Sequence, residues 1–569
     1  MKYLELCKVY QELEDNPSRL KKIEILSEFL RKIKHEKNLE IIYLLKGRIF
    51  PDYDTREIGI SEQLTIKALG KATGIEKNKI VKEWKKSGDL GEVAQSLIGK
   101  KKQSTLFSKK LTTEKVLENL KKLPGLEGKG TVNKKIDLIS ELLTSSSAIE
   151  AKYITRTLLS DLRIGSGDGT LRDAIVSSCF NKEDKEAQIL VQESYDRTTD
   201  FALVLEEACK GKIALEQAEI TPGRPLKVML YPKVASISEA FEVVGKPAAC
   251  EFKYDGFRML INKDEKGEIR IFTRRLDEVT KQFPEVKEYA KKYIKGESFI
   301  IDSEAVGFDP KTGKSKQFQE ISQRIKRKYN IEKVQKELPV EINVFDILFY
   351  NNKPLLKIPF IERRKILEKI IKPKKHALVL ADQIITDNEK KVSEFYKKAL
   401  AEGEEGIMIK KLDAPYKPGA RVGYGVKLKP AENELDLVIV KAEAGTGKRA
   451  GWLTSFTVAC RGDDNKLLEI GKVSTGLKEK AGEKTSFEDM THKLKKLIKS
   501  EHGREVIVKP EIVITITYQE IQASPTYSSG YALRFPRFTR LREDRSIKDI
   551  ASLDEVKKDY ARQRSYYLG

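Results

Sequence analysis

The distribution of apolar residues along the chain predicts a helical first part. Up to about residue 217, apolar side chains recur at intervals of three and four residues, as in the run Ile23, Leu26, Phe29, Leu30 and Ile33. That spacing places them on one face of a helix. The opening residues, MKYLELCKVYQELED, repeat the pattern with acids among them, so we expect an amphipathic helix and no secretory signal. Residues 1–217 are therefore expected to form an all-α domain.

A second pattern begins after Thr221–Pro232, which contains three prolines and one glycine and is typical of a domain boundary. The runs CEFKY, EIRIFTR, SFIIDSEAVGF, VEINVFDILFY and GIMIKK are rich in β-forming residues, and IERRKILEKII between them has helical spacing. This alternation predicts an α+β domain over residues 218–430.

From residue 431 the strands become short and closely spaced. LDLVIVKAEAG, FTVACRG, LEIGKVSTG and IVITITYQEI each end near turn residues, and a basic segment follows. Such spacing is typical of a small β-barrel. We expect residues 431–569 to form a C-terminal β-barrel of the OB-fold type with a basic motif.

The net charge of the chain indicates what kind of molecule it binds. The 569 residues include 108 Lys and Arg against 86 Asp and Glu, a formal net charge of +22. A surplus of this size indicates a polyanionic partner, although a charge-rich surface suited to high temperature gives the same composition. The basic run RIKRK, Arg324–Lys328, is expected to be a solvated face.

Other composition features exclude several classes of protein. With 40% hydrophobic residues the chain can form cores, and no apolar run approaches the roughly 18 residues that a membrane span needs. The five cysteines are scattered without CxxC spacing, so a disulfide framework is not expected and a cytoplasmic location fits. Four histidines, none in HxxxH spacing, argue against His-based zinc hydrolysis and make a triad built on histidine improbable.

Lys253 is the candidate nucleophile. It ends the strand run of EFKYDGFR and precedes Asp255-Gly256, a pair typical of tight turns. A lysine acts as a nucleophile only when nearby cations or desolvation lower the pKa of its amine. On this motif alone, a surface lysine in a hairpin remains the more frequent interpretation.

Other segments of the sequence contain residues suited to bind a metal ion, a base or a phosphate. We expect Glu304 at the end of one strand beside Asp302, and Glu405 just before another, which makes both carboxylates candidate Mg²⁺ ligands. Phe345 is expected to close a strand and to stack on a base. Lys427 and Lys429 alternate with apolar residues, so a strand would place both on one face, toward a phosphate.

The glycine-rich stretch RIGSGDGTLRDAI, Arg163–Ile175, predicts a turn that opens a helix, with Asp168 or Thr170 as the N-cap. Exposed backbone N–H groups there would suit a phosphate. An ordinary connection between helices explains the same residues.

The order of these runs resembles the covalent nucleotidyltransferase superfamily, and within it the ATP-dependent DNA ligases of archaeal type, over nearly the whole chain. KYDGFR, FTRRLDEVT, DSEAVGF, VFDILF, EGIMIK and KLKP resemble the motifs of the catalytic domain in sequence order. ALRFPRFTRLREDRS resembles the motif of the OB-fold domain, and EAKYITRTLLSDLRIGSGDGTLRDA the DNA-gripping part of the helical domain. The chain departs from the family at Arg275, where Asn is usual, and at Gly425, where Trp is frequent.

The resemblance implies a role for each matching residue. Lys253 would become adenylylated, and Glu304 and Glu405 would bind the metal. The nucleotide would be contacted by Glu251, Arg258, Arg274, Glu304, Phe345, Lys410, Arg421, Lys427 and Lys429. Arg163 and Gly165 would contact DNA. Arg534, Arg537, Asp544 and Arg545 would orient the pyrophosphate.

The implied reaction is the sealing of nicks in duplex DNA, with ATP as co-substrate and Mg²⁺, or Mn²⁺ in its place, as the cation. The roles implied are DNA replication, repair and recombination. Nicked double-stranded DNA is the expected partner, with a sliding clamp as a further candidate, and a monomer is expected. Two alternatives stay open: an RNA ligase or capping-type nucleotidyltransferase, and a nucleic-acid-binding protein without catalysis.

Overall fold

The computed structural model describes residues 1–565 except 37, 55, 101–110, 129, 317, 326, 328, 431–432, 446–448, 450, 465 and 480–484. The chain forms two compact units. The first comprises residues 1–232, 256–381 and 411–424, and the second comprises 233–255, 382–410 and 425–569. Within the described residues, no helix is long and apolar enough to cross a lipid bilayer.

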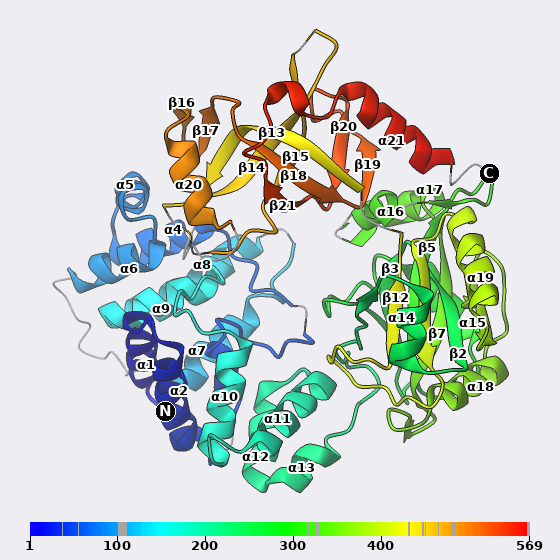
Figure 1. Ribbon diagram of the computed structural model, residues 1–569. Helices are drawn as coiled ribbons and strands as arrows, with labels where there is room; N and C mark the ends of the chain where they lie inside the picture. The colour runs from blue at the N-terminus through cyan, green and yellow to red at the C-terminus, as the bar shows by residue number, and fades with distance from the viewer. Residues whose placement is uncertain are drawn as a thin grey trace. The chain divides into compact units, whose positions relative to one another are not determined.

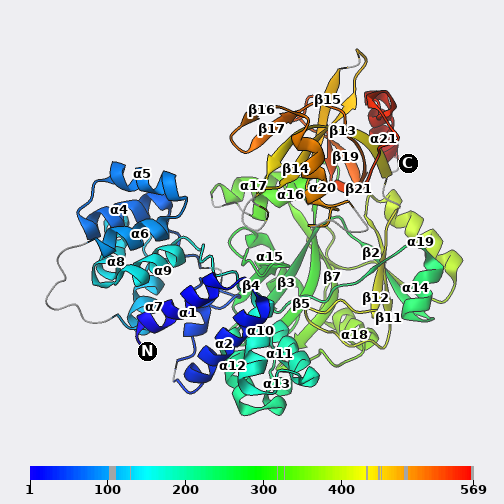
Figure 2. The same ribbon diagram turned by 60° about the vertical axis from the view of Figure 1, so that its left-hand side comes forward.

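The first unit begins with the predicted helical segment. Its helices are α1 (Tyr3–Asp15), α2 (Arg19–Ile33), α3 (Ile41–Leu44), α4 (Glu62–Thr73), α5 (Lys77–Ser87), α6 (Leu90–Gly99), α7 (Thr113–Lys122), α8 (Thr131–Ser145), α9 (Ala148–Leu158), α10 (Asp168–Cys179), α11 (Lys185–Thr198), α12 (Phe201–Lys210) and α13 (Lys212–Gln217). Figures 1 and 2 show α4, α5, α6 and α8 gathered in one group and α10 to α13 in another. A continuous apolar core runs through the segment, from Tyr3 to Leu215. The predicted periodicity is confirmed in α1 and α2.

The same unit contains a mainly antiparallel sheet in the order β4-β3-β5-β7-β8, with β6 paired to β5 and β9 to β7. Its elements are β3 (Phe257–Lys263), β4 (Ile269–Thr273), α15 (Pro284–Tyr293), β5 (Phe299–Phe308), β6 (Ser315–Lys316), α16 (Phe318–Ile325), α17 (Ile331–Glu337), β7 (Val340–Tyr350), β8 (Lys353–Pro354), α18 (Phe360–Ile370) and β9 (Leu378–Leu380). Alternate residues of β3 enter two different cores. Met259 and Ile261 pack with α15 and α18, whereas Leu260 packs with Met229 and Tyr416 on the other face.

The second unit contains a smaller sheet in the order β1-β12-β11-β2-β10. Its elements are β1 (Lys233–Val234), α14 (Ile237–Val244), β2 (Ala248–Lys253), β10 (Gln383–Thr386), α19 (Glu389–Ala401), β11 (Gly406–Lys411) and β12 (Gly425–Leu428). One face is buried, because apolar residues of β2, β11 and β12 pack with Phe241 of α14 and Phe395 of α19. The residues that alternate with these core positions must project from the opposite face.

The C-terminal part of the second unit is rich in strands. Its elements are β13 (Asn433–Ala444), β14 (Leu453–Arg461), β15 (Leu467–Val473), α20 (Phe487–Lys495), β16 (Ile498–His502), β17 (Glu505–Val508), β18 (Val513–Tyr518), β19 (Glu520–Ala523), β20 (Tyr531–Arg534), β21 (Arg537–Leu541), the 3₁₀ turn η2 (Ile547–Asp549) and α21 (Leu553–Ser565). The long strand β13 pairs with β14, β17 and β18, and alternate residues of these strands enter a common apolar core.

Several local predictions are wrong. Glu304 and Phe345 lie inside β5 and β7, not at strand ends, because both strands continue past them. Helix α10 begins at Asp168 and its N-cap is Gly167. Asp168 instead pairs with Lys46, 2.9 Å away.

Arg324, the first residue of the basic run at 324–328, is buried, so the prediction of a solvated face is wrong for it. The Arg324 side chain is 1% exposed, donates hydrogen bonds to Gln282 O and Leu338 O, and pairs with Glu285 at 2.7 Å. Arg327 is exposed as expected. Lys326 and Lys328 lie outside the described residues.

Candidate active site

Lys253 occupies the last position of β2, as the sequence predicts. Ala248, Cys250 and Phe252 of this strand enter the core below α14 and α19, so Glu251 and Lys253 project from the other face. The end of β2 is held against the start of β11, because Glu405 N donates a 2.9 Å hydrogen bond to Lys253 O. The same contact brings the two side chains together: Lys253 Nζ lies 2.7 Å from Glu405 Oε2.

Glu405 is shared by two lysines. Its Oε2 pairs with Lys253 and also with Lys429, which directly follows β12. Burial alone would raise the pKa of Glu405, but the two ammonium groups outweigh burial and lower it to about 2. Burial, and then the charge of Lys253, lower the pKa of Lys429. Two cations and one carboxylate leave a net positive charge at this point, which suits a phosphate.

Two further predicted residues form a buried pair on the same face. Glu251 Oε2 lies 2.5 Å from Lys410 Nζ of β11, and both side chains are almost fully buried. Glu251 Oε1 accepts a 2.8 Å hydrogen bond from Gln383 Nε2, the residue opposite it on β10. Lys427 shares this face, because its neighbours Val426 and Leu428 enter the core. The second unit therefore holds two contact groups on this face, Lys253 and Lys429 with Glu405, and Glu251 with Lys410. Lys427 lies on β12, which pairs with β11.

In the first unit, Arg258 and Glu304 lie directly opposite each other on β3 and β5. Phe345 of β7 is close to them, because the Arg258 guanidinium lies 5.4 Å from the centre of its ring. The ladder pairs Asp302 with Asp346 and Ser303 with Val344, so Phe345 is the extra residue of a β-bulge. Bulges re-aim side chains at functional sites, and no local pattern in the sequence indicates this one.

The Arg258 guanidinium is engaged within the sheet. It donates a 2.8 Å hydrogen bond to Asp302 Oδ1, another of 2.8 Å to Met229 O, and one of 3.1 Å to Tyr416 Oη. Tyr416 in turn donates to Asp302. Asp302 is fully buried and forms an ion pair with the Arg258 guanidinium, so it is the counter-ion of Arg258. The sequence analysis missed this role for Asp302 and Tyr416, since the partners are far apart in the chain.

Gly256 shows why the nucleophile motif contains a glycine. A Cβ on this residue would lie 2.3 Å from Ala305 O of β5. Its φ angle does not fall in the left-handed region. The glycine is therefore required by the close approach of β5, and the turn chemistry predicted for Asp255-Gly256 is not the reason.

Arg274 and Arg421 are exposed residues of the first unit. Arg274 follows β4, and Arg421 forms an isolated backbone bridge with Leu230. Neither joins the contacts described for Arg258.

Two of the predicted C-terminal arginines, Arg534 and Arg545, have acidic partners. Arg534 of β20 is buried and pairs with Glu520 of β19 at 2.9 Å, and its Nη2 lies 3.5 Å from Asp255 Oδ1. Arg545 pairs with Asp436 and Asp544 with Arg542, both at 2.7 Å. Arg537 is exposed. The acidic partners Glu520 and Asp436 were not predicted.

Arg163 and Gly165 lie in the loop between α9 and α10, and both have left-handed φ angles, 59° and 63°. Lys22 Nζ donates a hydrogen bond to Ile164 O in this loop, and a Cβ on Gly165 would lie 2.5 Å from that ammonium. The left-handed φ angle and the nearby ammonium both favour glycine at this position. The Arg163 side chain is 44% exposed.

The carboxylates predicted to bind a cation fit only a site that substrate phosphates complete. Among the described residues, no group of three His, Cys, Asp or Glu side chains forms a metal cluster. Mg²⁺ is often bound by one or two carboxylates together with substrate phosphates. Glu405, held ionised by its lysine partners, has the carboxylate oxygens that such a site needs.

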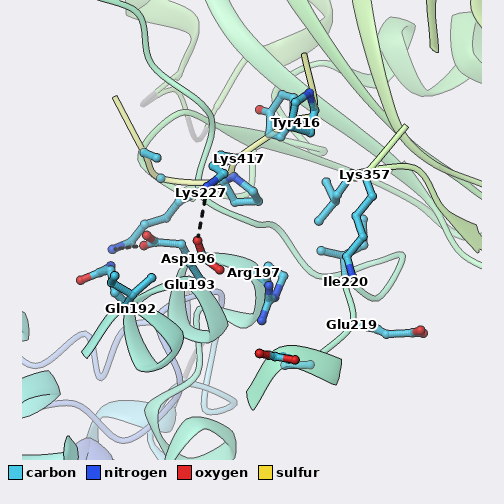
Figure 3. A pocket seen from close by; sticks show the side chains of 18 of the residues that line it. Gln192, Glu193, Asp196, Arg197, Glu219, Ile220, Lys227, Lys357, Tyr416 and Lys417 are labelled. Carbon is cyan, nitrogen blue, oxygen red and sulfur yellow. Dashed lines mark ion pairs between the residues drawn. The ribbon is translucent and has the colours of Figure 1, made fainter. Parts of the chain in front are cut away.

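A cavity of about 1350 Å³ lies in the first unit, and the sequence did not indicate it. Figure 3 shows Asp196 of α11, Lys227 of the following linker and Lys417 at its wall. Lys227 Nζ lies 3.2 Å from Asp196 Oδ1, and Gly419 N donates to Lys227 O. None of the residues predicted for catalysis lines this cavity. The cavity is lined by residues of α11, of the linker that contains Lys227 and of the segment around Gly419.

Three family descriptions match this chain in order. "DNA ligase N terminus" matches residues 2–176, "ATP dependent DNA ligase domain" matches 228–429, and "ATP dependent DNA ligase C terminal region" matches 449–545. Together the matches span most of the chain.

Curated relatives align over the full length. A DNA ligase of Nanoarchaeum equitans is 45% identical over 569 residues, covering 99% of each chain. One of Thermococcus onnurineus is 39% identical over 568 residues, covering 100% of this chain and 99% of its own. The solved structure named Pmar-Lig_PreS3 has a TM-score of 0.54 and 17% identity, covering 94% of this chain and 99% of its own, which is a likeness of fold.

Proposed function

We propose that this chain, which belongs to the ATP-dependent DNA ligase family of nick-sealing enzymes, carries AMP on Lys253 during the reaction. The observation that supports this assignment is the pairing of Lys253 and Lys429 with the single carboxylate of Glu405. The Lys429 ammonium meets Lys253 at the same carboxylate oxygen, so fixed positive charge lies beside the proposed nucleophile. The net positive charge favours the phosphates of ATP.

The first step is a transfer to the lysine. The neutral amine of Lys253 attacks the α-phosphate, so that an N–P bond forms, the bond to the β-phosphate oxygen breaks, and pyrophosphate leaves. AMP then passes to the 5′-phosphate of the nick. The 3′-hydroxyl attacks that activated phosphate, and AMP is released. The phosphoramidate keeps the energy of ATP cleavage available for joining.

Other polar residues of the chain are proposed to contact the nucleotide. For this role we propose Glu251, Arg258, Arg274, Glu304, Phe345, Lys410, Arg421, Lys427 and Lys429. Fixed cations aimed at the phosphates stabilise the charge that develops in phosphoryl transfer. Phe345, displaced from the ladder by its bulge, has the ring to stack on adenine. Arg258 acts through its fixed position, since its guanidinium is bound to Asp302.

Glu405 and Glu304 are the proposed ligands of a Mg²⁺ ion, with Mn²⁺ as an alternative. When bound, the cation would neutralise charge on the reacting phosphate. Glu405 would exchange a lysine contact for the cation.

The DNA and pyrophosphate contacts are assigned to other parts of the chain. We propose that Arg163 and Gly165 contact the duplex backbone, since an exposed guanidinium and backbone groups at a glycine suit phosphates. Arg534, Arg537, Asp544 and Arg545 are proposed to orient the pyrophosphate. Domains at 1–217, 218–430 and 431–569 fit these roles, with an all-α first domain and an OB-fold in the third. The pairing of β13 with β14 and β18 around one apolar core supports the OB-fold.

The enzyme is expected to act as a monomer in the cytoplasm, with a sliding clamp as a candidate partner. Free cysteines throughout the described residues fit a reducing compartment. RNA ligases and capping enzymes, the first alternative from the sequence, are not favoured, because the full-length relatives are DNA ligases.

The test is incubation with α-labelled ATP and Mg²⁺, followed by peptide mapping of the label. We expect the label on the peptide that contains Lys253, and sealing of a nicked DNA duplex when DNA is added. Label on another residue would overturn the assignment of Lys253.

A further inference from the structure

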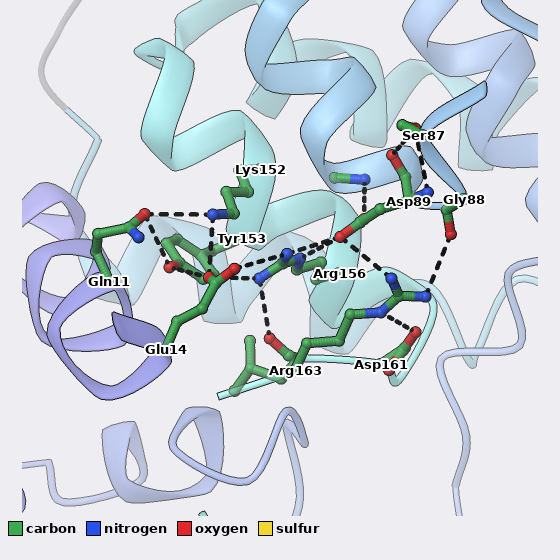
Figure 4. Close-up of polar contacts among 12 residues, drawn as sticks. Gln11, Glu14, Ser87, Gly88, Asp89, Lys152, Tyr153, Arg156, Asp161 and Arg163 are labelled. Carbon is green, nitrogen blue, oxygen red and sulfur yellow. Dashed lines mark hydrogen bonds and ion pairs between the residues drawn. The ribbon is translucent and has the colours of Figure 1, made fainter. Parts of the chain in front are cut away.

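We propose that Asp89 is a positioning residue for DNA binding, whose buried carboxylate holds the guanidinium of Arg163 in place for a DNA phosphate. The inference rests on the proposed contact between Arg163 and DNA. Asp89 lies outside every motif that the sequence analysis singled out, and 74 positions separate it from Arg163 along the chain. Figure 4 shows the contacts that connect the two residues.

Asp89 is fixed at the start of α6. It is the N-cap of this helix, and its Oδ1 accepts a 2.7 Å hydrogen bond from Gly91 N. Its Oδ2 faces two guanidinium groups: Arg156 Nη2 lies 2.6 Å away and Arg163 Nη1 lies 3.4 Å away. One carboxylate, 6% exposed, thus connects a buried arginine to a surface arginine.

Arg156 anchors this carboxylate from below. Its side chain is 3% exposed and pairs with Glu14 of α1 as well as with Asp89. Lys152, also on α9, lies 3.0 Å from Glu14. Gly91 permits the close packing of α6 on α9, because a Cβ there would lie 2.7 Å from Arg156 Cγ.

The charges of this network cancel in pairs. Glu14 and Asp89 supply two negative charges, and Lys152 and Arg156 supply two positive ones. Burial would raise the pKa of Asp89, but Arg156 outweighs burial and lowers it, so that the carboxylate is ionised at neutral pH. Because Arg156 already balances Asp89, Asp89 can hold Arg163 without neutralising its positive charge.

The Arg163 guanidinium contacts one buried carboxylate, Asp89, and one exposed carboxylate, Asp161. Besides Asp89, it donates to Gly88 O at 3.4 Å and to Asp161 Oδ2 at 2.6 Å. The Asp161 side chain is 54% exposed. A DNA phosphate can replace this exposed carboxylate, whereas Asp89 is enclosed by α6 and α9. The two carboxylates on one guanidinium therefore have opposite effects on DNA binding: Asp89 orients Arg163, and Asp161 competes with DNA for it.

The experiment compares the change from aspartate to asparagine at positions 89 and 161. Binding of the full chain to a nicked duplex is measured by fluorescence anisotropy for the wild type, Asp89→Asn, Asp161→Asn, Arg163→Ala and the double variant Asp89→Asn/Arg163→Ala. Asparagine keeps the N-cap, and thermal melts of each variant record any loss of stability. Self-adenylylation of the wild type without DNA tests the proposed function separately.

We expect Asp89→Asn to weaken DNA binding about fivefold, the size of coupling found between contacting charged residues. Asp161→Asn should strengthen it. In the Arg163→Ala background, Asp89→Asn should change the Kd by less than about twofold, since Asp89 acts through Arg163. A loss that persists in that background, or an Arg163→Ala variant that binds DNA as the wild type does, would overturn the inference. A wild type that fails to label Lys253 would contradict the proposed function and leave these comparisons of binding intact.

Discussion

Lys253 Nζ lies 2.7 Å from Glu405 Oε2, and the backbone N–H of Glu405, just before β11, donates a hydrogen bond to the carbonyl of Lys253 at the end of β2. The proposed nucleophile is thus held by its strand and by its counter-ion at once. A second lysine, Lys429, competes for the same carboxylate. This arrangement keeps a second ammonium group close to Lys253.

Replacing Lys253 by alanine should separate the steps of the reaction. Self-adenylylation should fall to background, because no other amine has this position, while sealing of a nick that already carries AMP should partly survive. The measurement is labelling with α-labelled ATP beside ligation of a pre-adenylylated duplex. Lys253→Arg is the control: it keeps the positive charge but supplies no neutral amine, so it should also fail to label. Uptake of AMP at the wild-type rate in either variant would show that another residue is the nucleophile.

Removing the charge of Glu405 should change stability in a defined pH range. The folded-state pKa of Glu405, about 2, lies below its ordinary value of 4.5. Its stabilising contribution is therefore fully present above about pH 4.5 and is lost as the pH falls toward about 2. Glu405→Gln should lower the free energy of unfolding by about 2 kcal/mol at pH 7, and the difference from the wild type should shrink on acidification. Thermal melts of both proteins between pH 7 and pH 3 measure this, and a constant difference would contradict it.

Asp302→Asn should be strongly destabilising in the first unit. Asp302 is fully buried and is the counter-ion of Arg258, and removal of one partner of a buried pair costs about 3–5 kcal/mol. Tyr416→Phe is the matched control, since it deletes one hydroxyl from the same network and should cost about 1 kcal/mol. Urea unfolding curves give both values. Equal losses in the two variants would show that the ion pair contributes no more than a neutral hydrogen bond.

Gly419→Ala should destabilise the segment beside the cavity. Gly419 has φ +68°, and a Cβ there would lie 2.3 Å from the Asp196 carboxylate carbon. The backbone strain and the clash together should cost about 2–3 kcal/mol. Gly74→Ala is the control, because Gly74 has φ +72° and no atom within 4 Å of such a Cβ, so only the backbone penalty of about 1 kcal/mol applies. Similar melting temperatures for the two variants would mean that Asp196 moves aside without penalty.

Arg163→Ala should reduce the salt dependence of DNA binding. Loss of one phosphate contact should lower the slope of log K against log salt by about 0.9, equally for all duplex sequences. Arg163→Lys keeps the charge, so its slope should stay near the wild-type value although its affinity falls. Binding titrations of nicked duplexes at several salt concentrations provide the slopes. An unchanged slope for Arg163→Ala would place Arg163 outside the DNA contact.

The alternation of residues along single strands was readable from the sequence. VEINVFDILFY and GIMIKK correspond to β7 and β11 with the predicted bounds, and Lys253 does end β2. On β2, β11 and β12, apolar and polar positions alternate, so the face that carries Glu251, Lys410 and Lys427 follows from a period of two. The order of these runs also indicated the family, which the full-length relatives confirm.

Partners across the fold were decided only by tertiary structure. Arg258 meets Asp302 and Tyr416, which lie 44 and 158 positions away in the chain. Arg156 meets Asp89 across 67 positions, Phe345 is displaced by a bulge, and Arg324 is buried within a basic run. Local patterns report which face of a strand or helix a residue occupies, because that depends on near neighbours. Which groups meet on that face depends on strand register and helix packing, and therefore on the free energy of the whole folded chain.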